Sequence, residues 1–169
     1  MRWAALGLLL LGLPAVARAD ERFDHRGAVG LLLNGGVANW SLRSPDYSEF
    51  GFRGLGEIGG TWTIDVNGNE LVLLARGAFG PGPLGLGLSG GYRGYFGYQQ
   101  VKTFLELQVA VHARPTFLVG PRVGGGFQYE LTPNVGVYLG GAVNLAFGNG
   151  LLLSGEVTGG VQLRSYLLE

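Results

Sequence analysis

A two-residue alternation of apolar and polar side chains runs through almost the whole chain and limits its fold more than any other feature. Between residues 101 and 113, the odd-numbered positions are almost wholly apolar, and the even-numbered positions carry Lys102, Glu106, Gln108 and His112. We call each such set of alternate positions in a strand a parity. Successive side chains of a β-strand point to opposite faces, so this period predicts strands with one apolar face. No long window keeps the 3.6-residue period of an amphipathic helix, and we therefore expect an all-β fold.

Turn residues divide the alternating chain into eight segments, which we expect to pair as an antiparallel up-and-down meander. The connections are centred on residues 44–47, 67–69, 80–83, 99–100, 114–116, 132–134 and 148–150. The first segment, about residues 27–42, carries apolar residues of both parities. We expect a glycine bulge near Asn34-Gly35-Gly36 to bring Leu33 and Trp40 onto the same face.

The first twenty residues predict export. Arg2 is followed by an apolar run over residues 4–13 and by Ala17-Arg18-Ala19. A basic start, an apolar stretch too short to span a bilayer and a small-residue cleavage site are the three parts of a secretory signal peptide. We expect residues 1–19 to be a signal peptide, residues 20–26 a polar leader, and residues 27–169 a single barrel domain.

Charge and strand length indicate which face of the barrel meets solvent. Charged residues make up 14% of the chain, whereas a water-facing exterior would carry about a quarter to a third. The predicted strands of about 11–16 residues exceed the about 9–11 tilted residues that cross a bilayer. We therefore expect the apolar face to point outward to lipid. The formal net charge of zero offers no basic field for nucleic acid, which we do not expect as a partner.

Aromatic residues of the predicted apolar face gather at both ends of the strands. Two such belts are typical of rings that meet lipid headgroups. With both termini in the periplasm, the belt at the external rim is Trp40, Phe50, Phe52, Phe79, Phe117 and Phe147. The belt at the periplasmic rim is Trp62, Phe96, Tyr98, Phe127 and Tyr129.

The signal end Ala17-Arg18-Ala19, the eight alternating strands and the final strand Leu151 to Leu167 resemble the small eight-stranded outer-membrane β-barrels of Gram-negative bacteria. These are barrels of the OmpA-transmembrane, OmpX and opacity-protein type. The resemblance implies a monomer in the bacterial outer membrane, surrounded by lipid and inserted by the outer-membrane assembly machinery. The chain departs from that family in its short external connections and in its end, Tyr166-Leu167-Leu168-Glu169, which lacks a final aromatic residue.

The polar parity places six basic and four acidic side chains inside the barrel. They are Arg53, Glu57, Arg76, Arg93, Lys102, Glu106, Arg122, Glu130, Glu156 and Arg164. Because a buried charge without a partner is costly, we expect a salt-bridged interior in which Glu57 pairs with Arg76 and Glu106 with Arg122. An eight-stranded barrel is barely wide enough for its own side chains, so we expect no open channel. A narrow pore or a proton path is the alternative.

Two other functions stay open at this stage. A soluble secreted barrel of the lipocalin type would turn the apolar face inward and bind a hydrophobic ligand. A lipid-modifying barrel enzyme would use His112, for which Ser154 is the candidate nucleophile nearest in position along the barrel axis.

No further motif in the sequence points to a cofactor or a metal. The letters of Gly54 to Gly59 match a dinucleotide-binding motif, but no helix is predicted after them. Two distant histidines and scattered carboxylates form no ligand cluster. We therefore expect no catalytic residue, cofactor or metal, and a non-enzymatic outer-membrane barrel for envelope structure or surface interaction.

Overall fold

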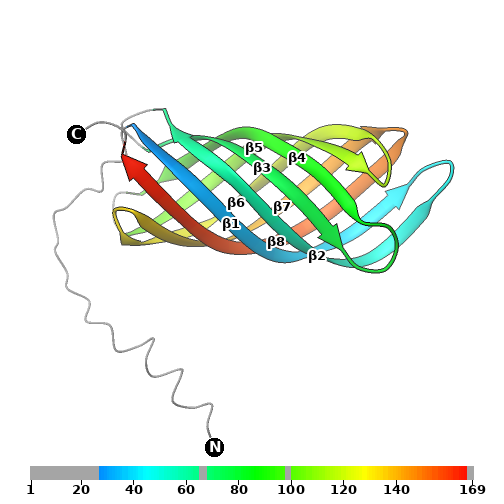
Figure 1. Cartoon of the computed structure of the whole chain (residues 1–169), viewed down its shortest axis with the longest axis horizontal. Helices are drawn as coiled ribbons and strands as arrows, with labels where there is room; N and C mark the ends of the chain where they lie inside the picture. Colours follow the sequence, from blue (N-terminus) through cyan, green and yellow to red (C-terminus); the bar gives the residue numbers. More distant parts are fainter. Residues whose placement is uncertain (1–26, 65–67, 98–99, 167–169) are drawn as a thin grey trace, which may run out of the picture.

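The strands form one closed antiparallel barrel in which each strand pairs with its neighbours in sequence and β1 pairs with β8 (Figure 1). The computed structural model describes residues 27–64, 68–97 and 100–166. The strands are β1 (Ala28–Arg43), β2 (Ser48–Thr63), β3 (Glu70–Phe79), β4 (Gly85–Phe96), β5 (Val101–Arg114), β6 (Leu118–Thr132), β7 (Val135–Gly148) and β8 (Gly150–Tyr166). The eight-stranded up-and-down barrel predicted from the alternation is confirmed. The predicted signal peptide, the predicted leader and Tyr98 lie outside the described residues.

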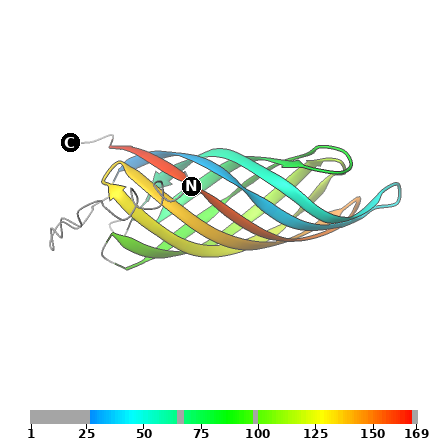
Figure 2. The ribbon, with the colours of Figure 1, turned by 90° about the horizontal axis from the view of Figure 1, so that it is seen from below.

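The barrel is elongated, and its strands cross the long axis at a steep tilt (Figures 1 and 2). We call the end where β1 begins and β8 ends the terminus end, and the opposite end, where β1 turns into β2, the hairpin end. In both views the β1–β2 hairpin projects furthest at the hairpin end. Among the described residues, none forms a helix long and apolar enough to cross a bilayer.

Pairing of the first and last strands removes the free edges of the sheet. β1 and β8 pair in continuous register from Ala28 opposite Tyr166 to Arg43 opposite Leu151. A closed sheet gives its backbone amides and carbonyls hydrogen-bond partners within the sheet itself, which is what a spanning structure needs in hydrocarbon.

The apolar parity faces outward and the polar parity faces inward. Leu73, Leu107 and Phe127 are each more than 60% exposed, whereas Arg53 and Glu70 are 1% and 0% exposed. A hydrophobic-ligand barrel needs the opposite orientation, with the apolar face around an inner cavity. The structure therefore contradicts the soluble lipocalin-type interpretation.

β1 corrects one sequence prediction. Trp40 is 3% exposed and Leu42 is 0% exposed, so both point into the barrel. The pairing of β1 with β2 and β8 runs without a register shift, and no bulge occurs at Gly35 or Gly36. Placing Trp40 in the external aromatic belt was therefore wrong. Its inward position has a physical reason, because the hairpin end of the interior is filled by an apolar cluster of Ala38, Trp40, Leu42, Leu55, Ala78, Leu118, Ala146 and Leu152.

A β-bulge does occur in β5, near the hairpin end. Gly87 lies opposite His112, but the next residue of β4, Leu86, lies opposite Arg114. Ala113 is thus the extra residue, and a bulge of one residue reverses the direction of the side chains that follow it. Arg114 consequently lies beside the outward-facing Leu86, although strict alternation from His112 would point it inward.

Candidate functional site

Ten charged side chains inside the barrel form one continuous chain of contacts, which we call the ion-pair ladder. Five carboxylates alternate along it with five cations, and each member contacts the next. In order they are Glu57, Arg76, Glu156, Arg122, Glu106, Arg93, Glu70, Arg164, Glu130 and Lys102. The ladder is therefore electrically neutral, which lowers the cost of enclosing so many charges.

The half of the ladder nearer the hairpin end crosses the interior between distant strands. Arg76 donates from Nε to Glu57 Oε1 at 2.7 Å and from Nη2 to Glu156 Oε2 at 2.7 Å. Arg122 donates from Nε to the same Glu156 oxygen at 2.9 Å and from Nη1 to Glu106 Oε2 at 3.0 Å. Glu156 of β8 thus joins an arginine of β3 to one of β6.

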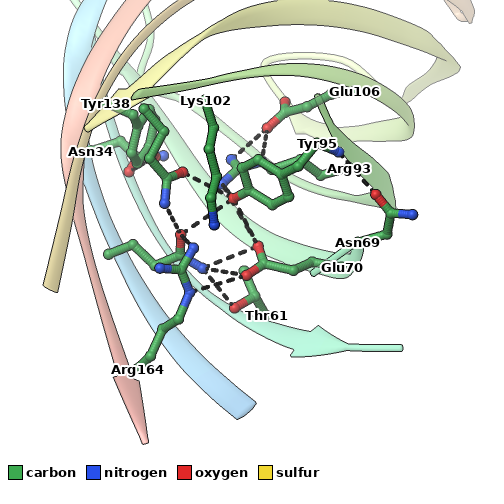
Figure 3. Close-up of polar contacts among 12 residues, drawn as sticks. Asn34, Thr61, Asn69, Glu70, Arg93, Tyr95, Lys102, Glu106, Tyr138 and Arg164 are labelled. Carbon is green, nitrogen blue, oxygen red and sulfur yellow. Dashed lines mark hydrogen bonds and ion pairs between the residues drawn. The ribbon is translucent and has the colours of Figure 1, made fainter. Parts of the chain in front are cut away.

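The other half continues toward the terminus end (Figure 3). Arg93 donates from Nε to Glu106 Oε1 at 2.6 Å and lies 4.0 Å from Glu70. Glu70 is 3.3 Å from Nε of Arg164, which in turn donates to Glu130 at 2.8 Å. Lys102 Nζ closes the ladder at 3.7 Å from Glu130.

Neutral side chains complete the polar contacts of this half. Gln162 donates from Nε2 to Glu70 Oε1 at 2.8 Å, and the Tyr95 hydroxyl donates to Gln128 Oε1 at 2.9 Å. A carboxylate has several acceptor positions, and the Gln162 amide occupies one on Glu70 beside the contact of Arg164. The interior is thus a connected network rather than a set of isolated ion pairs.

Aromatic rings fill the interior next to the ladder. The ring of Phe104 lies edge-on to those of Tyr95 and Tyr138, with centroids 6.2 and 5.9 Å apart. The Arg93 guanidinium lies over the Phe104 and Tyr138 rings at 4.8 and 5.1 Å. A cavity of about 10 Å³ beside Arg93, Tyr138 and Glu57 has room for about one water molecule.

A separate clamp joins two hairpins at the hairpin end. Arg53 donates from Nε to Glu49 Oε1 at 2.8 Å, from Nη1 to the Pro83 carbonyl at 2.8 Å and from Nη2 to the Pro81 carbonyl at 3.0 Å. Tyr47 donates its hydroxyl to Glu49, and this hydrogen bond raises the pKa of Tyr47. The β1–β2 connection is thereby tied to the β3–β4 connection.

Two interior carboxylates are missing from the set predicted by sequence, Glu70 and Glu49. The same reasoning could have found both. Glu70 belongs to the inward set of alternate positions in its strand, and Glu49 belongs to the same set as Arg53 in the next strand back along the chain. With them the interior holds six basic and six acidic groups, namely the five and five of the ladder plus Arg53 and Glu49. The structure contains both of the ion pairs expected on neighbouring strands, Glu57 with Arg76 and Glu106 with Arg122.

The aromatic residues predicted at the strand ends lie on the outer surface, apart from Trp40, which is buried, and Tyr98, which is outside the described residues. At the hairpin end the outward rings are Phe50, Phe52, Phe79, Phe117 and Phe147. At the terminus end they are Trp62, Phe96, Phe127 and Tyr129. Leu, Val and Ile side chains cover the surface between the two groups.

His112 lies inside the barrel near the hairpin end. Its Nε2 is 2.8 Å from Asn144 Nδ2, and its ring lies edge-on to Trp40 at 5.7 Å. Ser154, the candidate nucleophile, donates its hydroxyl to Glu156 instead. Across residues 27–64, 68–97 and 100–166, no group of three His, Asp or Glu side chains is arranged to hold a metal ion.

No protein-family model and no curated protein sequence matches the chain. Solved structures do match it. The crystal structure of Neisserial surface protein A is 22% identical, with a TM-score of 0.59 over 82% of this chain and 99% of that one. The N-terminal barrel of Pseudomonas aeruginosa OprF is 13% identical, with a TM-score of 0.59 over 82% and 98%. A de novo designed transmembrane β-barrel is 13% identical, with a TM-score of 0.51 over 82% and 96%. The chain thus has the fold of the small eight-stranded outer-membrane β-barrels.

Proposed function

We propose that this protein is a non-enzymatic outer-membrane β-barrel with a closed, salt-bridged interior, which contributes to envelope structure or to interactions at the surface. The observation that carries the proposal is the separation of chemistry between the two faces of the sheet. Large apolar side chains cover the outer face, while twelve charged side chains are enclosed. Soluble monomers rarely expose a contiguous apolar patch of more than a few hundred Å², whereas lipid matches such a surface.

The arrangement of the outer surface supports a membrane location in more detail. Leu and Val side chains form the middle of the surface, and aromatic rings lie at both ends. This is the order in which a spanning barrel meets hydrocarbon and then headgroups. The similarity to the barrels of OprF and Neisserial surface protein A supports the outer membrane as that location.

The interior supports a structural role. The ladder with the aromatic rings beside it and the apolar cluster at the hairpin end together occupy the interior. A narrow barrel filled in this way resists ion flow, because passage requires ion pairs to separate in a medium of low dielectric constant. In a planar bilayer we expect no large stable conductance, and a steady open channel would contradict the closed interior.

Membrane fractionation with a single substitution tests the proposal. We expect the protein in the washed outer-membrane fraction, with different gel mobility before and after boiling, as for a detergent-resistant barrel. Leu107 is outward-facing in the middle of β5, and Leu107→Arg should cost about 2–4 kcal/mol of unfolding free energy in lipid vesicles. The matched control is Asn149→Arg, in the exposed β7–β8 turn, which should cost about 0–1 kcal/mol. Recovery in the soluble periplasm without a mobility shift, or equal costs for the two variants, would refute a membrane barrel.

A further inference from the structure

Two Asn-Gly pairs lie in the described part of the chain, and the structure places them in opposite environments. Asn149-Gly150 lies in the β7–β8 turn at the hairpin end, whereas Asn34-Gly35 lies within β1. An asparagine before a glycine is the one that loses its side-chain amide most readily, because glycine has no side chain to shield its backbone nitrogen and its backbone turns freely. The surroundings of each asparagine therefore decide whether it reacts.

The side chain of Asn149 is free to move. Asn149 is exposed, and its side-chain amide makes no hydrogen bond within the described residues. Only its backbone is held. The amide of Asn149 donates to the carbonyl of Phe117 at 3.1 Å, and the carbonyl of Asn149 accepts the hydroxyl of Thr116 at 3.5 Å. The carboxamide can therefore turn toward the nitrogen of Gly150.

The side chain of Asn34 is held at both of its polar atoms. Its Nδ2 donates to Glu57 Oε2 at 2.9 Å, and its Oδ1 accepts the hydroxyl of Tyr138. The backbone of Gly35 lies within the continuous pairing of β1 with β2 and β8. An attack on the Asn34 side chain would have to break both side-chain bonds and disturb the sheet, so the same dipeptide is protected here.

From this contrast we propose that Asn149 is a site of spontaneous deamidation, with water as the co-reactant. The backbone nitrogen of Gly150 attacks Cγ of Asn149, a new C–N bond closes a succinimide ring, and the side-chain nitrogen leaves with the proton of Gly150 as ammonia. Water then opens the ring. Its attack at Cγ gives aspartate, and its attack at the backbone carbonyl carbon gives isoaspartate. No redox partner or enzyme is needed.

Both products change the surface of the hairpin end. A carboxylate replaces a neutral amide near the end of β1, because Leu151 lies opposite Arg43. Isoaspartate also routes the backbone through Cγ, and this lengthens a turn in which Asn149 alone separates the paired Gly148 and Gly150. The modified chain therefore differs from the newly made one in surface charge and in the geometry of this hairpin.

Incubation of the folded, detergent-solubilised protein at mildly alkaline pH tests the proposal. Peptide mapping by mass spectrometry, after digestion at acidic pH, measures the aspartyl and isoaspartyl products at each asparagine. We expect Asn149 to react at least about tenfold faster than Asn34, because a single hydrogen bond to a carboxylate costs that much to break. Asn67, which precedes Gly68, lies outside the described residues, and its peptide is measured separately.

Two controls make the result decisive. In urea, Asn34 and Asn149 should react at similar rates, because the unfolded chain protects neither. Asn149→Gln keeps an exposed amide but lengthens the side chain, so the acidic form that Asn149 produces on isoelectric focusing should disappear. If Asn149 keeps its amide in the folded barrel while both asparagines react in urea, the turn holds the side chain away from Gly150 and the site does not exist. Equal rates at Asn34 and Asn149 in the folded barrel would also overturn the proposal.

Discussion

Glu156→Gln removes one charge from the middle of the ladder while keeping the size of the side chain. One carboxylate oxygen of Glu156 accepts hydrogen bonds from Arg76 at 2.7 Å and from Arg122 at 2.9 Å. Its other oxygen accepts the Ser154 hydroxyl at 3.1 Å. In the variant, Arg76 keeps one carboxylate of the ladder, Glu57, and Arg122 keeps one, Glu106, so two enclosed cations face each other across a neutral amide.

The burial of these groups determines how much unfolding free energy the Glu156→Gln variant should lose. The side chains of Arg76, Arg122 and Glu156 are 7%, 3% and 1% exposed, so water screens them little. Removing one partner of a buried ion pair typically costs about 3–5 kcal/mol, and we expect a loss of that size in unfolding free energy. Urea titration in lipid vesicles, followed by the mobility difference between folded and unfolded protein on unheated gels, measures this loss.

A matched substitution outside the interior gives the reference value. Asp46→Asn also neutralises one carboxylate, but in an exposed connection, and it should change the unfolding free energy by about 0.5 kcal/mol or less. A double variant with Arg122→Gln should be less damaged than the sum of its single variants, because the two residues interact directly. A loss below about 1 kcal/mol for Glu156→Gln would refute the view that the ladder holds the interior together.

Two further predictions test the packing and the corrected face of β1. A Cβ at Gly91 would lie 2.1 Å from the Leu107 carbonyl oxygen, so Gly91→Ala should lower the unfolding free energy by about 1–3 kcal/mol in the same urea titration. The control is Gly155→Ala, which should be close to neutral because a Cβ there would have nothing within 4 Å. In a chain that starts at Asp20, lipids with brominated chains should quench the fluorescence of Trp62, which is 62% exposed, and leave that of Trp40 almost unchanged. Equal quenching of the two tryptophans would place Trp40 back on the outer surface.

The fold could be predicted from the sequence because its signal is repeated. Eight alternating segments with short connections leave few arrangements other than an antiparallel meander, and closure follows from the need to satisfy the edges. A two-residue period assigns every side chain of a strand to one of two faces, and on this basis ten of the twelve enclosed charged residues were predicted, all but Glu70 and Glu49. Orientation of the barrel required composition as well, because alternation alone fits a soluble barrel equally.

The connectivity of the ladder could be predicted only in part. Pairs on neighbouring strands, such as Glu57 with Arg76, follow from register along a single hairpin. The contact between Arg76 and Glu156 joins residues 80 positions apart, on strands that are not neighbours. It depends on the width of the closed barrel and on the heights at which long arginine side chains meet across it. Neither quantity is encoded in the pattern of a single strand.

Two of the places where strict alternation and the structure disagree, in β1 and in β5, are informative because they are opposite errors. In β1, apolar residues of both parities suggested a bulge, yet the strand is regular and Trp40 joins the apolar cluster inside. In β5, the pattern gave no sign of a bulge, yet Ala113 interrupts the pairing and turns Arg114 outward. Parity treats every inward position as polar and every strand as uninterrupted. The first assumption fails where the interior of the hairpin end is sealed by apolar packing, and the second fails where one inserted residue moves a cation to the rim.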